Sequence, residues 1–485
     1  MAALDVRALT RRAAPALILA AACNESPAPP AEAPFAARLD SAVAEAVRNR
    51  ELPGAALVVV QGDRITYSKG FGHADLAAGR PYTDSSHTVI GSTSKPVTAL
   101  AVLRLVQLGR VALDTPIVRY VPDLAFKDPR GQAITLRHLL TNRSGLAVGF
   151  SGPAFERPSR VGPGEVEGLA RQMAEMPLLF APGEGYAYSN RGWALAGYVV
   201  QRVSGTPIEA FLRTEVFEPL GMTETTLEFW KVTDMVQGYR EGRQPRNVPA
   251  PASLSQEYGP SGMIVSTPRD MGRLLVAMLN RGKTVLGTQF LTPELIDEAL
   301  RGQAEAESEL GGPTRYALGW EVDSTFGDLT IKKAGSVSTM VSLWVMLPSR
   351  KLGLAFAFNR EDYQVVPLVG TVLAIVAGGE AKPFTSTPAP PSVAPAAVPI
   401  APAVRDRWVG DYDTRYGDLR IFVRGDSLLA RTEGMDIPLA ATDDSTFALV
   451  TDLVSETGKA FQFRRRGPAV TVWSGRDSLG IRLRP

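Results

Sequence analysis

The stretch IGSTSKPVTALAVLRLVQLG, residues 90–109, contains a serine, Ser92, and, three residues later, a lysine, Lys95. From Val97 to Leu108 the apolar residues recur at helical spacing, and Gly109 provides a stop signal. We therefore expect a regular helix that begins close to Ser92. Residues three apart lie on the same helix face, so Lys95 is expected within reach of the Ser92 hydroxyl.

This pairing has a chemical and a purely structural interpretation. A serine hydroxyl is a weak nucleophile at neutral pH and needs an adjacent base or cation, which Lys95 would supply. The positive end of the helix dipole would also stabilise an alkoxide developing on Ser92. Against this, the same spacing occurs by chance in many proteins, and serine is a common helix N-cap. The pattern alone does not separate a nucleophile from a helix start.

A second polar element precedes another apolar helix in the stretch APGEGYAYSNRGWALAGYVV, residues 181–200. Its turn carries Tyr188, Ser189 and Asn190. A phenol has an ordinary pKa near 10, and nearby lysines would lower that pKa enough for Tyr188 to take a proton from Ser92. The Asn190 amide could position Lys95 and a substrate carbonyl. The structural alternative is a tyrosine packed in a turn and an asparagine that caps the helix.

A third element, KKAGSVS at residues 332–338, lies at the end of an expected strand. Lys333 followed by the small residues Ala334 and Gly335 would let a strand edge lie along a substrate. The backbone N–H of Ser336 could join that of Ser92 in an oxyanion hole. The alternative is an ordinary strand with a solvated lysine.

Taken in this order, the three elements S-x-x-K, Y-x-N and K-x-G resemble the serine β-lactamase and penicillin-recognising superfamily. The middle element resembles the class C β-lactamase-like branch, which also contains D-stereospecific peptidases and carboxylesterases. Further stretches are similar to that family, and the resemblance covers nearly all of residues 38–380. They are ITLRHLLTNRSGL at 134–146, FEPLGMTETTL at 217–227 and PSGMIVSTPRDMGRLL at 260–275.

The resemblance implies a role for each residue. Ser92 would be acylated, Lys95 and Tyr188 would share the proton transfers, and the Ser92 and Ser336 amides would hold the oxyanion. The residues lining the substrate cleft would be Asn190, Lys333 and Gly335. Neither a metal nor another cofactor is implied. Whether Lys95 or Tyr188 is the general base stays open at this point.

Three positions depart from the family pattern. Ala334 stands where β-lactamases usually have a threonine whose hydroxyl helps to bind the substrate carboxylate. Asn142 replaces a common histidine and is interpreted as a loop-shape residue with a structural role. Ser261 replaces a second glycine, and we expect no functional effect from it, although it could alter the cleft wall.

The fold expected for residues 38–380 is α+β, of the β-lactamase/transpeptidase type. Residues 54–72 read as a β-hairpin, apolar strands return after residue 329, and a helical region lies between them. This predicts an antiparallel sheet flanked by helices with an inserted helical region. The apolar stretch at 365–379 is expected to be a buried terminal helix.

The two ends of the chain have different compositions. Residues 1–23 have arginines ahead of a short apolar run and the single cysteine, Cys23, which predicts a signal peptide of lipoprotein type with Cys23 as lipidation site. The protein is then expected to be exported from a bacterial cytoplasm, either periplasmic or tethered to a membrane through lipidated Cys23. Residues 24–37 form a linker. Residues 381–404 form a Pro-rich linker.

Alternating apolar and polar residues in 405–485 predict a small all-β barrel or sandwich, similar to the lipocalin-like modules that follow this family's domain. The even balance of 52 basic and 50 acidic residues argues against a nucleic-acid partner. Three widely separated histidines and one cysteine do not form a metal motif of ordinary spacing.

The leading hypothesis is a serine hydrolase that cleaves an ester, amide or β-lactam bond of a small molecule or peptide through a Ser92 acyl-enzyme. No G-x-S-x-G elbow surrounds Ser92, which argues against an α/β-hydrolase. Two alternative hypotheses assign the protein to functional classes other than hydrolases. One is a non-catalytic penicillin-binding sensor or scaffold, and the other is a protein whose C-terminal barrel binds the ligand.

Overall fold

The computed structural model describes most of the chain between residues 34 and 484. The described ranges are 34–49, 51–146, 165–241, 247–250, 254–308, 310, 312–337, 339–360, 366–376, 401–414, 417–432, 435–441, 444–449, 460–466, 469–474 and 477–484. The expected signal peptide 1–23, Cys23 and most of both linkers lie outside these ranges. Within them, no helix has the length and apolar character needed to cross a membrane.

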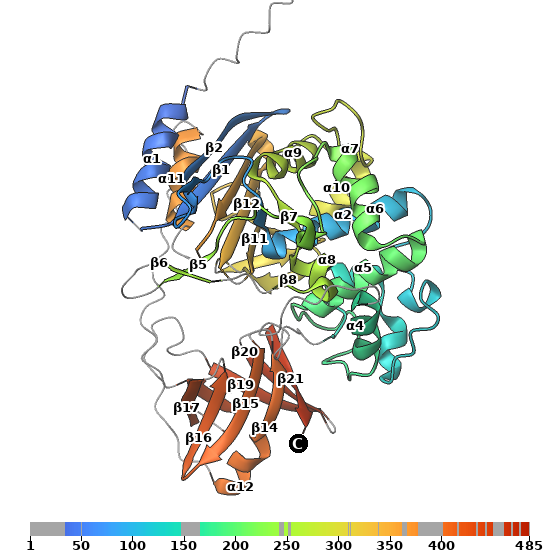
Figure 1. Ribbon diagram of the computed structural model, residues 1–485. Helices are drawn as coiled ribbons and strands as arrows, with labels where there is room; N and C mark the ends of the chain where they lie inside the picture. The colour runs from blue at the N-terminus through green and yellow to red at the C-terminus, as the bar shows by residue number, and fades with distance from the viewer. Residues whose placement is uncertain are drawn as a thin grey trace, which may run out of the picture.

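A nine-stranded antiparallel sheet forms the centre of the N-terminal domain, in the order β3-β2-β1-β13-β12-β11-β10-β9-β8 (Figure 1). Its strands are β1 (Gly54–Gln61), β2 (Arg64–Asp75), β3 (Arg80–Pro81), β8 (Ala304–Glu307), β9 (Pro313–Tyr316), β10 (Glu321–Asp323), β11 (Thr330–Val337), β12 (Met340–Leu347) and β13 (Leu352–Phe358). The expected hairpin is confirmed as β1 and β2, which turn at Gly62 with φ +65°. Strand β1 pairs with β13 along its length, so the first and last strands meet as expected.

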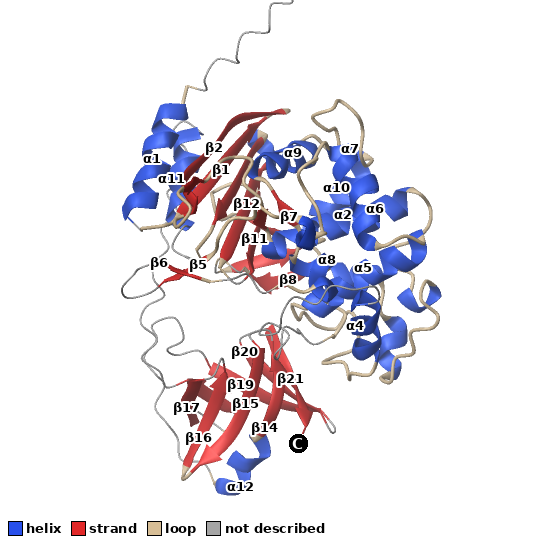
Figure 2. Ribbon diagram, in the orientation of Figure 1, coloured by secondary structure: helices blue, strands red, loops and turns tan. Residues whose placement is uncertain are grey.

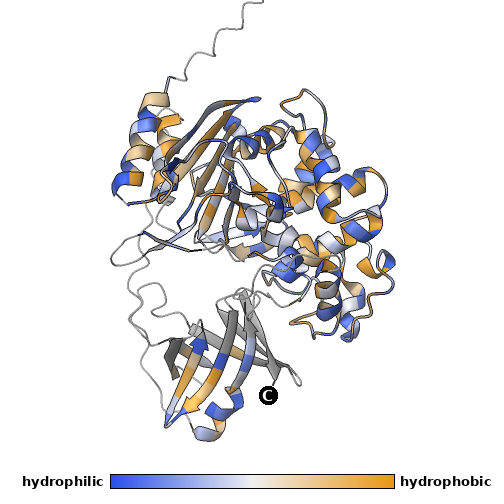
Figure 3. Cartoon of the chain, in the orientation of Figure 1, coloured by the Kyte–Doolittle hydropathy of each residue, from blue (hydrophilic) through white to orange (hydrophobic). Residues whose placement is uncertain are grey.

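Helices cover both faces of the sheet (Figure 2). On one face lie α1 (Ala36–Asn49) and α11 (Val366–Val376), the buried terminal helix expected from the sequence. Successive side chains of a strand point to opposite faces. Leu57 and Val59 of β1 accordingly pack with α1 and α11, whereas Val58 and Val60 pack with the helices of the other face. Figure 3 shows the resulting hydrophobic character of the central strands.

The chain between β2 and β8 forms the helical region on the other face. Its α-helices are α2 (Ser94–Gln107), α3 (Leu136–Leu140), α4 (Glu165–Ala174), α5 (Asn190–Ser204), α6 (Ile208–Leu212), α7 (Glu218–Leu220), α8 (Gly259–Gly262), α9 (Pro268–Leu279) and α10 (Pro293–Leu300). Two small ribbons accompany them, β4 (Thr88–Val89) with β7 (Val265–Ser266) and β5 (Tyr239–Glu241) with β6 (Asn247–Pro249). Short 3₁₀ turns, among them η1 (Gly91–Thr93) and η3 (Pro129–Ala133), connect these elements.

The C-terminal residues fold as a closed barrel, with each strand antiparallel to its neighbours. Its strands are β14 (Gly410–Thr414), β15 (Gly417–Arg424), β16 (Ser427–Thr432), β17 (Met435–Ala441), β18 (Thr446–Leu449), β19 (Ala460–Arg466), β20 (Ala469–Ser474) and β21 (Asp477–Arg484), preceded by the one-turn helix α12 (Pro402–Arg405). Inside, Phe463 contacts Trp408, Tyr412 and Phe447. The all-β character expected for this segment is confirmed, and its lipocalin-like assignment stays a prediction.

Asp128 ties the loop before α3 to the segment that leads to Tyr188. Its carboxylate accepts hydrogen bonds from the Arg130 side chain and from the backbone N–H groups of Arg130 and Leu178. The Arg130 hydrogen bonds, opposed by burial and helped by the two backbone donors, lower the pKa of Asp128 to about 2 from 3.8. The side chain is only 10% exposed, so solvent screens these interactions little.

We expect Asp128→Asn to lower the free energy of unfolding by about 2 kcal/mol at pH 7, because one pKa unit corresponds to about 1.4 kcal/mol. A lowered pKa gives stability that is fully present above the unfolded value of 3.8 and is lost as the pH falls toward 2. The difference in free energy of unfolding between wild type and Asp128→Asn, measured by urea unfolding, should therefore be smaller at pH 3 than at pH 7. Asp297→Asn, which removes an exposed partner of Arg281, serves as the control with no measurable change. If that difference in free energy were the same at both pH values, the lowered pKa of Asp128 would be contradicted.

Candidate active site

Ser92 lies in the middle of the 3₁₀ turn η1, immediately before α2. The regular helix expected to begin close to Ser92 is confirmed, since α2 starts two residues later, at Ser94. The N-cap position of α2 belongs to Thr93, and its side chain makes no capping hydrogen bond. The sequence alternative in which Ser92 serves as the helix cap is therefore wrong, and its partly exposed side chain has other partners.

Lys95 is fully buried and donates to three acceptors. Its Nζ lies 2.9 Å from Ser92 Oγ, 2.7 Å from Asn190 Oδ1 and 2.8 Å from the backbone oxygen of Ser261. A lysine ammonium has three N–H donors, so this arrangement suits the protonated amine. The sequence placed Ser92, Lys95 and Asn190 together correctly, but it did not indicate the carbonyl of Ser261.

Tyr188 completes the cluster from the turn that precedes α5. Its hydroxyl lies 2.8 Å from Ser92 Oγ. The Nζ atoms of Lys95 and Lys333 lie 4.7 Å and 5.0 Å from the centre of the Tyr188 ring. Ser189 caps α5 by accepting from the N–H of Gly192, and Asn190 is the first helical residue, so its amide is left for Lys95. The expected apolar helix is confirmed, but Asn190 is its first residue and is not part of the segment before it.

Asn142 holds this turn in place from the end of α3. Its φ is +56°, a left-handed conformation that asparagine tolerates better than most residues. Its side-chain oxygen accepts from the Ser189 N–H at 3.2 Å and from the Trp193 indole at 3.0 Å. Asn142 is thus a structural residue, as expected: its backbone oxygen also accepts from the Ala187 N–H, so its contacts hold the chain on both sides of Tyr188.

Gly335 and Gly91 allow β11 to approach η1 very closely. A Cβ atom on Gly335 would lie 2.7 Å from the backbone nitrogen of Ser92 and 2.3 Å from the oxygen of Ile90. A Cβ on Gly91, which has φ +55°, would lie 2.5 Å from the nitrogen of Ser336. The backbone segments that carry the two expected oxyanion donors, the N–H groups of Ser92 and Ser336, therefore lie against each other where β11 passes η1.

Lys333 is fully buried, so the alternative of a solvated lysine is wrong. Its Nζ lies 3.8 Å from the carboxylate of Glu321 on β10 and 5.6 Å from the ring centre of Tyr316 on β9. Sequence analysis missed both partners, because no local pattern around either residue marks it as part of the site. The side chain of Ser261 is also buried and donates to the Tyr258 oxygen, so it leaves the cleft wall unaltered.

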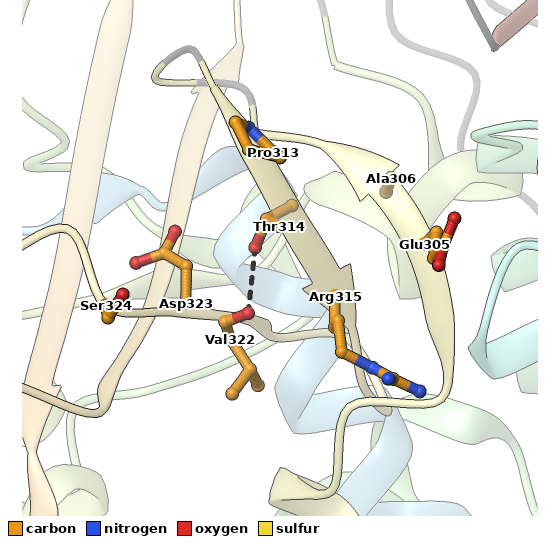
Figure 4. Close-up of a pocket in the computed structure, with 8 residues that line it drawn as sticks. All are labelled: Glu305, Ala306, Pro313, Thr314, Arg315, Val322, Asp323 and Ser324. Carbon is orange, nitrogen blue, oxygen red and sulfur yellow. Dashed lines mark hydrogen bonds between the residues drawn. The ribbon is translucent and has the colours of Figure 1, made fainter.

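A shallow hollow of about 420 Å³ opens at the β8 edge of the sheet (Figure 4). Its lining residues are Glu305, Ala306, Pro313, Thr314, Arg315, Val322, Asp323 and Ser324. These residues come from β8, β9 and the β10 region, and they do not include Ser92, Lys95 or Tyr188. Among the residues that the structure describes, no group of three or more His, Cys, Asp or Glu side chains is arranged to hold a metal ion.

Comparisons with known proteins give named relatives of the chain. The chain is 32% identical over 313 residues to esterase EstB of Burkholderia gladioli, which covers 58% of this chain and 78% of EstB. It is 30% identical over 215 residues to lovastatin esterase of Penicillium rubens, covering 40% of this chain and 53% of that protein.

Solved structures show the same fold. An octameric penicillin-binding protein homologue from Pyrococcus abyssi superposes with a TM-score of 0.62 at 24% identity, over 92% of this chain and 99% of that one. The β-lactamase/transpeptidase-like fold expected from the sequence is thereby confirmed. The family model named Beta-lactamase matches residues 39–377, well over half of the chain. The protein therefore belongs to the Beta-lactamase family.

Proposed function

We propose that the protein is a serine hydrolase that cleaves carboxylic esters through an acyl-enzyme formed on Ser92. The observation that carries this proposal is the position of Ser92 Oγ, 2.9 Å from Lys95 Nζ and 2.8 Å from the Tyr188 hydroxyl. Both distances are within the hydrogen-bond reach that proton transfer requires. A nucleophile with a proton acceptor and a cation at its side is the combination that activates serine.

In the proposed reaction, Tyr188 is the group that accepts the proton of Ser92. The three acceptors around Lys95 Nζ suit an ammonium, which has no lone pair to offer. Lys95 Nζ lies 4.7 Å from the centre of the Tyr188 ring, and a positive charge there favours the phenolate electrostatically. The phenolate removes the Ser92 proton as Oγ bonds to the carbonyl carbon.

The negative charge that develops on the carbonyl oxygen is stabilised by the N–H groups of Ser92 and Ser336. When the tetrahedral intermediate collapses, the carbon–oxygen bond to the alcohol breaks and Tyr188 returns the proton to that leaving group. Water then attacks the Ser92 ester, again losing its proton to Tyr188. The bond between the carbonyl carbon and Ser92 Oγ then breaks, Tyr188 gives the proton back to Oγ, and the carboxylic acid leaves.

Two observations favour an ester over a β-lactam or a peptide. Two relatives are named as esterases, and one of them matches over 78% of its own length. Ala334 has no hydroxyl with which to hold a substrate carboxylate on β11. Peptidase and β-lactamase activity are therefore the competing outcomes of the test below.

The test combines covalent labelling with turnover assays. Intact mass is measured for wild type and Ser92→Ala after brief exposure to a fluorophosphonate. Hydrolysis of p-nitrophenyl acetate and of nitrocefin is followed in parallel. We expect one adduct on wild type, none on Ser92→Ala, and turnover of the ester alone.

Other outcomes would overturn the proposal. Equal labelling of both proteins would remove Ser92 as the nucleophile. Nitrocefin turnover in place of ester turnover would favour a β-lactamase. A long-lived adduct with penicillin and no turnover of either substrate would identify a penicillin-binding sensor.

A further inference from the structure

Two buried hydroxyl groups meet at the turn that carries Ser92. Thr93 of η1 and Ser342 of β12 are both fully buried, and their hydroxyl oxygens lie 2.8 Å apart. Each of these oxygens also lies 2.6 Å from the carbonyl oxygen of Ile90, the residue before η1. A threonine hydroxyl that bonds a carbonyl three residues earlier is a common local contact. The hydroxyl of Ser342 makes this contact tertiary, because it reaches the same carbonyl from a strand of the sheet.

The hydroxyl pair of Thr93 and Ser342 acts on a peptide group that the local backbone leaves unconstrained. Gly91 follows Ile90 and has φ +55°. Glycine adopts positive and negative φ about equally readily, so steric effects alone do not fix the orientation of the peptide group between these two residues. The backbone N–H of Ile90 donates to the oxygen of Ile264 at 2.9 Å. Hydrogen bonds on both sides of Ile90 therefore decide the direction in which the chain enters η1.

The carbonyl of Ile90 also lies against the strand that carries the second expected oxyanion donor. A Cβ on Gly335 would lie 2.3 Å from the Ile90 oxygen and 2.7 Å from the Ser92 nitrogen. In the sheet, Gly335 of β11 pairs with Ser342 of β12. The hydroxyl of Ser342 therefore ties η1 to the part of the sheet that leads into Ser336. Without this tie, η1 could move away from β11, and the N–H groups of Ser92 and Ser336 would separate.

We propose that Thr93 and Ser342 are positioning residues, whose hydroxyls hold the nucleophile turn η1 at its working distance from β11. They act through the Ile90 carbonyl, and through it on the N–H and Oγ of Ser92, rather than on the substrate. A buried carbonyl that loses its hydrogen-bond partners is costly, so the turn would shift toward other donors if the hydroxyls were removed. This inference rests on the proposed Ser92 acyl-enzyme and adds two residues that no catalytic motif of the sequence marks.

The test removes each hydroxyl with little change in side-chain size. Thr93→Val keeps the branched shape and replaces the hydroxyl by a methyl group, and Ser342→Ala removes the second hydroxyl. We expect each to lower kcat for p-nitrophenyl acetate by about tenfold to a hundredfold, less than direct loss of an oxyanion donor. KM should stay within about threefold of wild type, because the lost interaction supports the transition state and not substrate binding. The losses should not multiply in the double variant, since the two hydroxyls share one acceptor.

Two further variants separate positioning from a general loss of stability. Thr93→Ser keeps the hydroxyl and should restore most of kcat. Thr330, at the start of β11, is also fully buried and donates its hydroxyl to the Asp328 oxygen at 3.0 Å. Thr330→Val therefore removes a comparable hydrogen bond at the end of β11 away from Ser336. We expect it to lower the melting temperature, as Thr93→Val does, but to keep kcat within about twofold of wild type.

Other results would overturn the inference. Wild-type kcat in both Thr93→Val and Ser342→Ala would do so. An equal loss of kcat in Thr330→Val would indicate a general loosening of the sheet, and a Thr93→Ser variant as slow as Thr93→Val would assign the effect to the methyl group. If Thr93→Val does not fold, Ser342→Ala and Thr93→Ser decide the question.

Failure of the proposed function would look different. Ester turnover that survives in Ser92→Ala would overturn the proposed function itself. Ser92-dependent turnover together with wild-type kcat in the variants of the hydroxyl pair would overturn this inference alone.

Discussion

Ser92→Ala is expected to lower kcat/KM for p-nitrophenyl ester hydrolysis by about 10⁴-fold or more, because no other group occupies the nucleophile's position. Lys95→Met should cost nearly as much. It removes the cation that contacts Ser92 Oγ and also leaves the amide oxygen of Asn190 and the carbonyl of Ser261 without their donor. Stopped-flow or steady-state assays at saturating and limiting ester concentrations measure both losses.

The double variant distinguishes a shared catalytic unit from two separate effects. Residues that act as a unit are strongly non-additive, so Ser92→Ala with Lys95→Met should be no slower than Ser92→Ala alone. Lys332→Met is the matched control, since it removes another buried lysine of the same domain and leaves Asp323 uncompensated. We expect that control to lower thermal stability and to keep most of the turnover. If the kcat/KM losses of the two single variants multiplied in the double variant, Ser92 and Lys95 would not act as one catalytic unit. A Lys332→Met variant that folds but is inactive would show that the loss in Lys95→Met is not specific to the active site.

Gly335→Ala is expected to lower kcat by about 10²- to 10³-fold, the usual effect of losing one oxyanion donor. The new methyl group would lie 2.7 Å from the nitrogens of Ser92 and Thr93 and 2.3 Å from the oxygen of Ile90. These are backbone atoms, so β11 must move away from η1. That movement separates the Ser92 and Ser336 N–H groups. The measurement is kcat and KM for the neutral ester, with the loss expected in kcat.

A second glycine of the same sheet tests whether the loss is specific. A Cβ on Gly353 of β13 would lie 3.0 Å from a terminal methyl of Leu279, which can turn aside. Gly353→Ala should therefore keep kcat within a few-fold of wild type. Fluorophosphonate labelling should still occur in Gly335→Ala, only more slowly. If Gly335→Ala kept the wild-type kcat, the backbone N–H groups of Ser92 and Ser336 would not act together on the oxyanion.

Much of the fold follows from local sequence patterns. Alternating and continuous apolar runs predicted the β1–β2 hairpin, the late strands, the buried helix α11 and the C-terminal β-strands. Local patterns predicted the start of α2 to within two residues but did not indicate the tight turn before it. Ser92 lies in a tighter turn there because Gly91, at φ +55°, brings the chain against Ser336. Such a close approach involves residues more than 200 positions apart, which no window around Ser92 contains.

The candidate active site also contains residues that local sequence patterns indicated and residues that they did not. Ser92, Lys95, Tyr188 and Asn190 carry recognisable spacing, and the structure brings all four together. Glu321 shows no such spacing. It follows a tryptophan in an ordinary strand, and its role depends on β10 being the neighbour of β11.

The sequence by itself determined the local elements and the reach of Lys95 to Ser92, because both depend on spacing along a short piece of chain. Only the tertiary structure decided that Lys333 is buried and matched with Glu321, and that Asn142 holds the turn of Tyr188. The first contact depends on β10 pairing with β11, and the second depends on the end of α3 packing against the segment before α5. The physical reason is that burial turns a distant carboxylate into the required partner of an ammonium, whereas along the chain the two are only charged residues 12 positions apart.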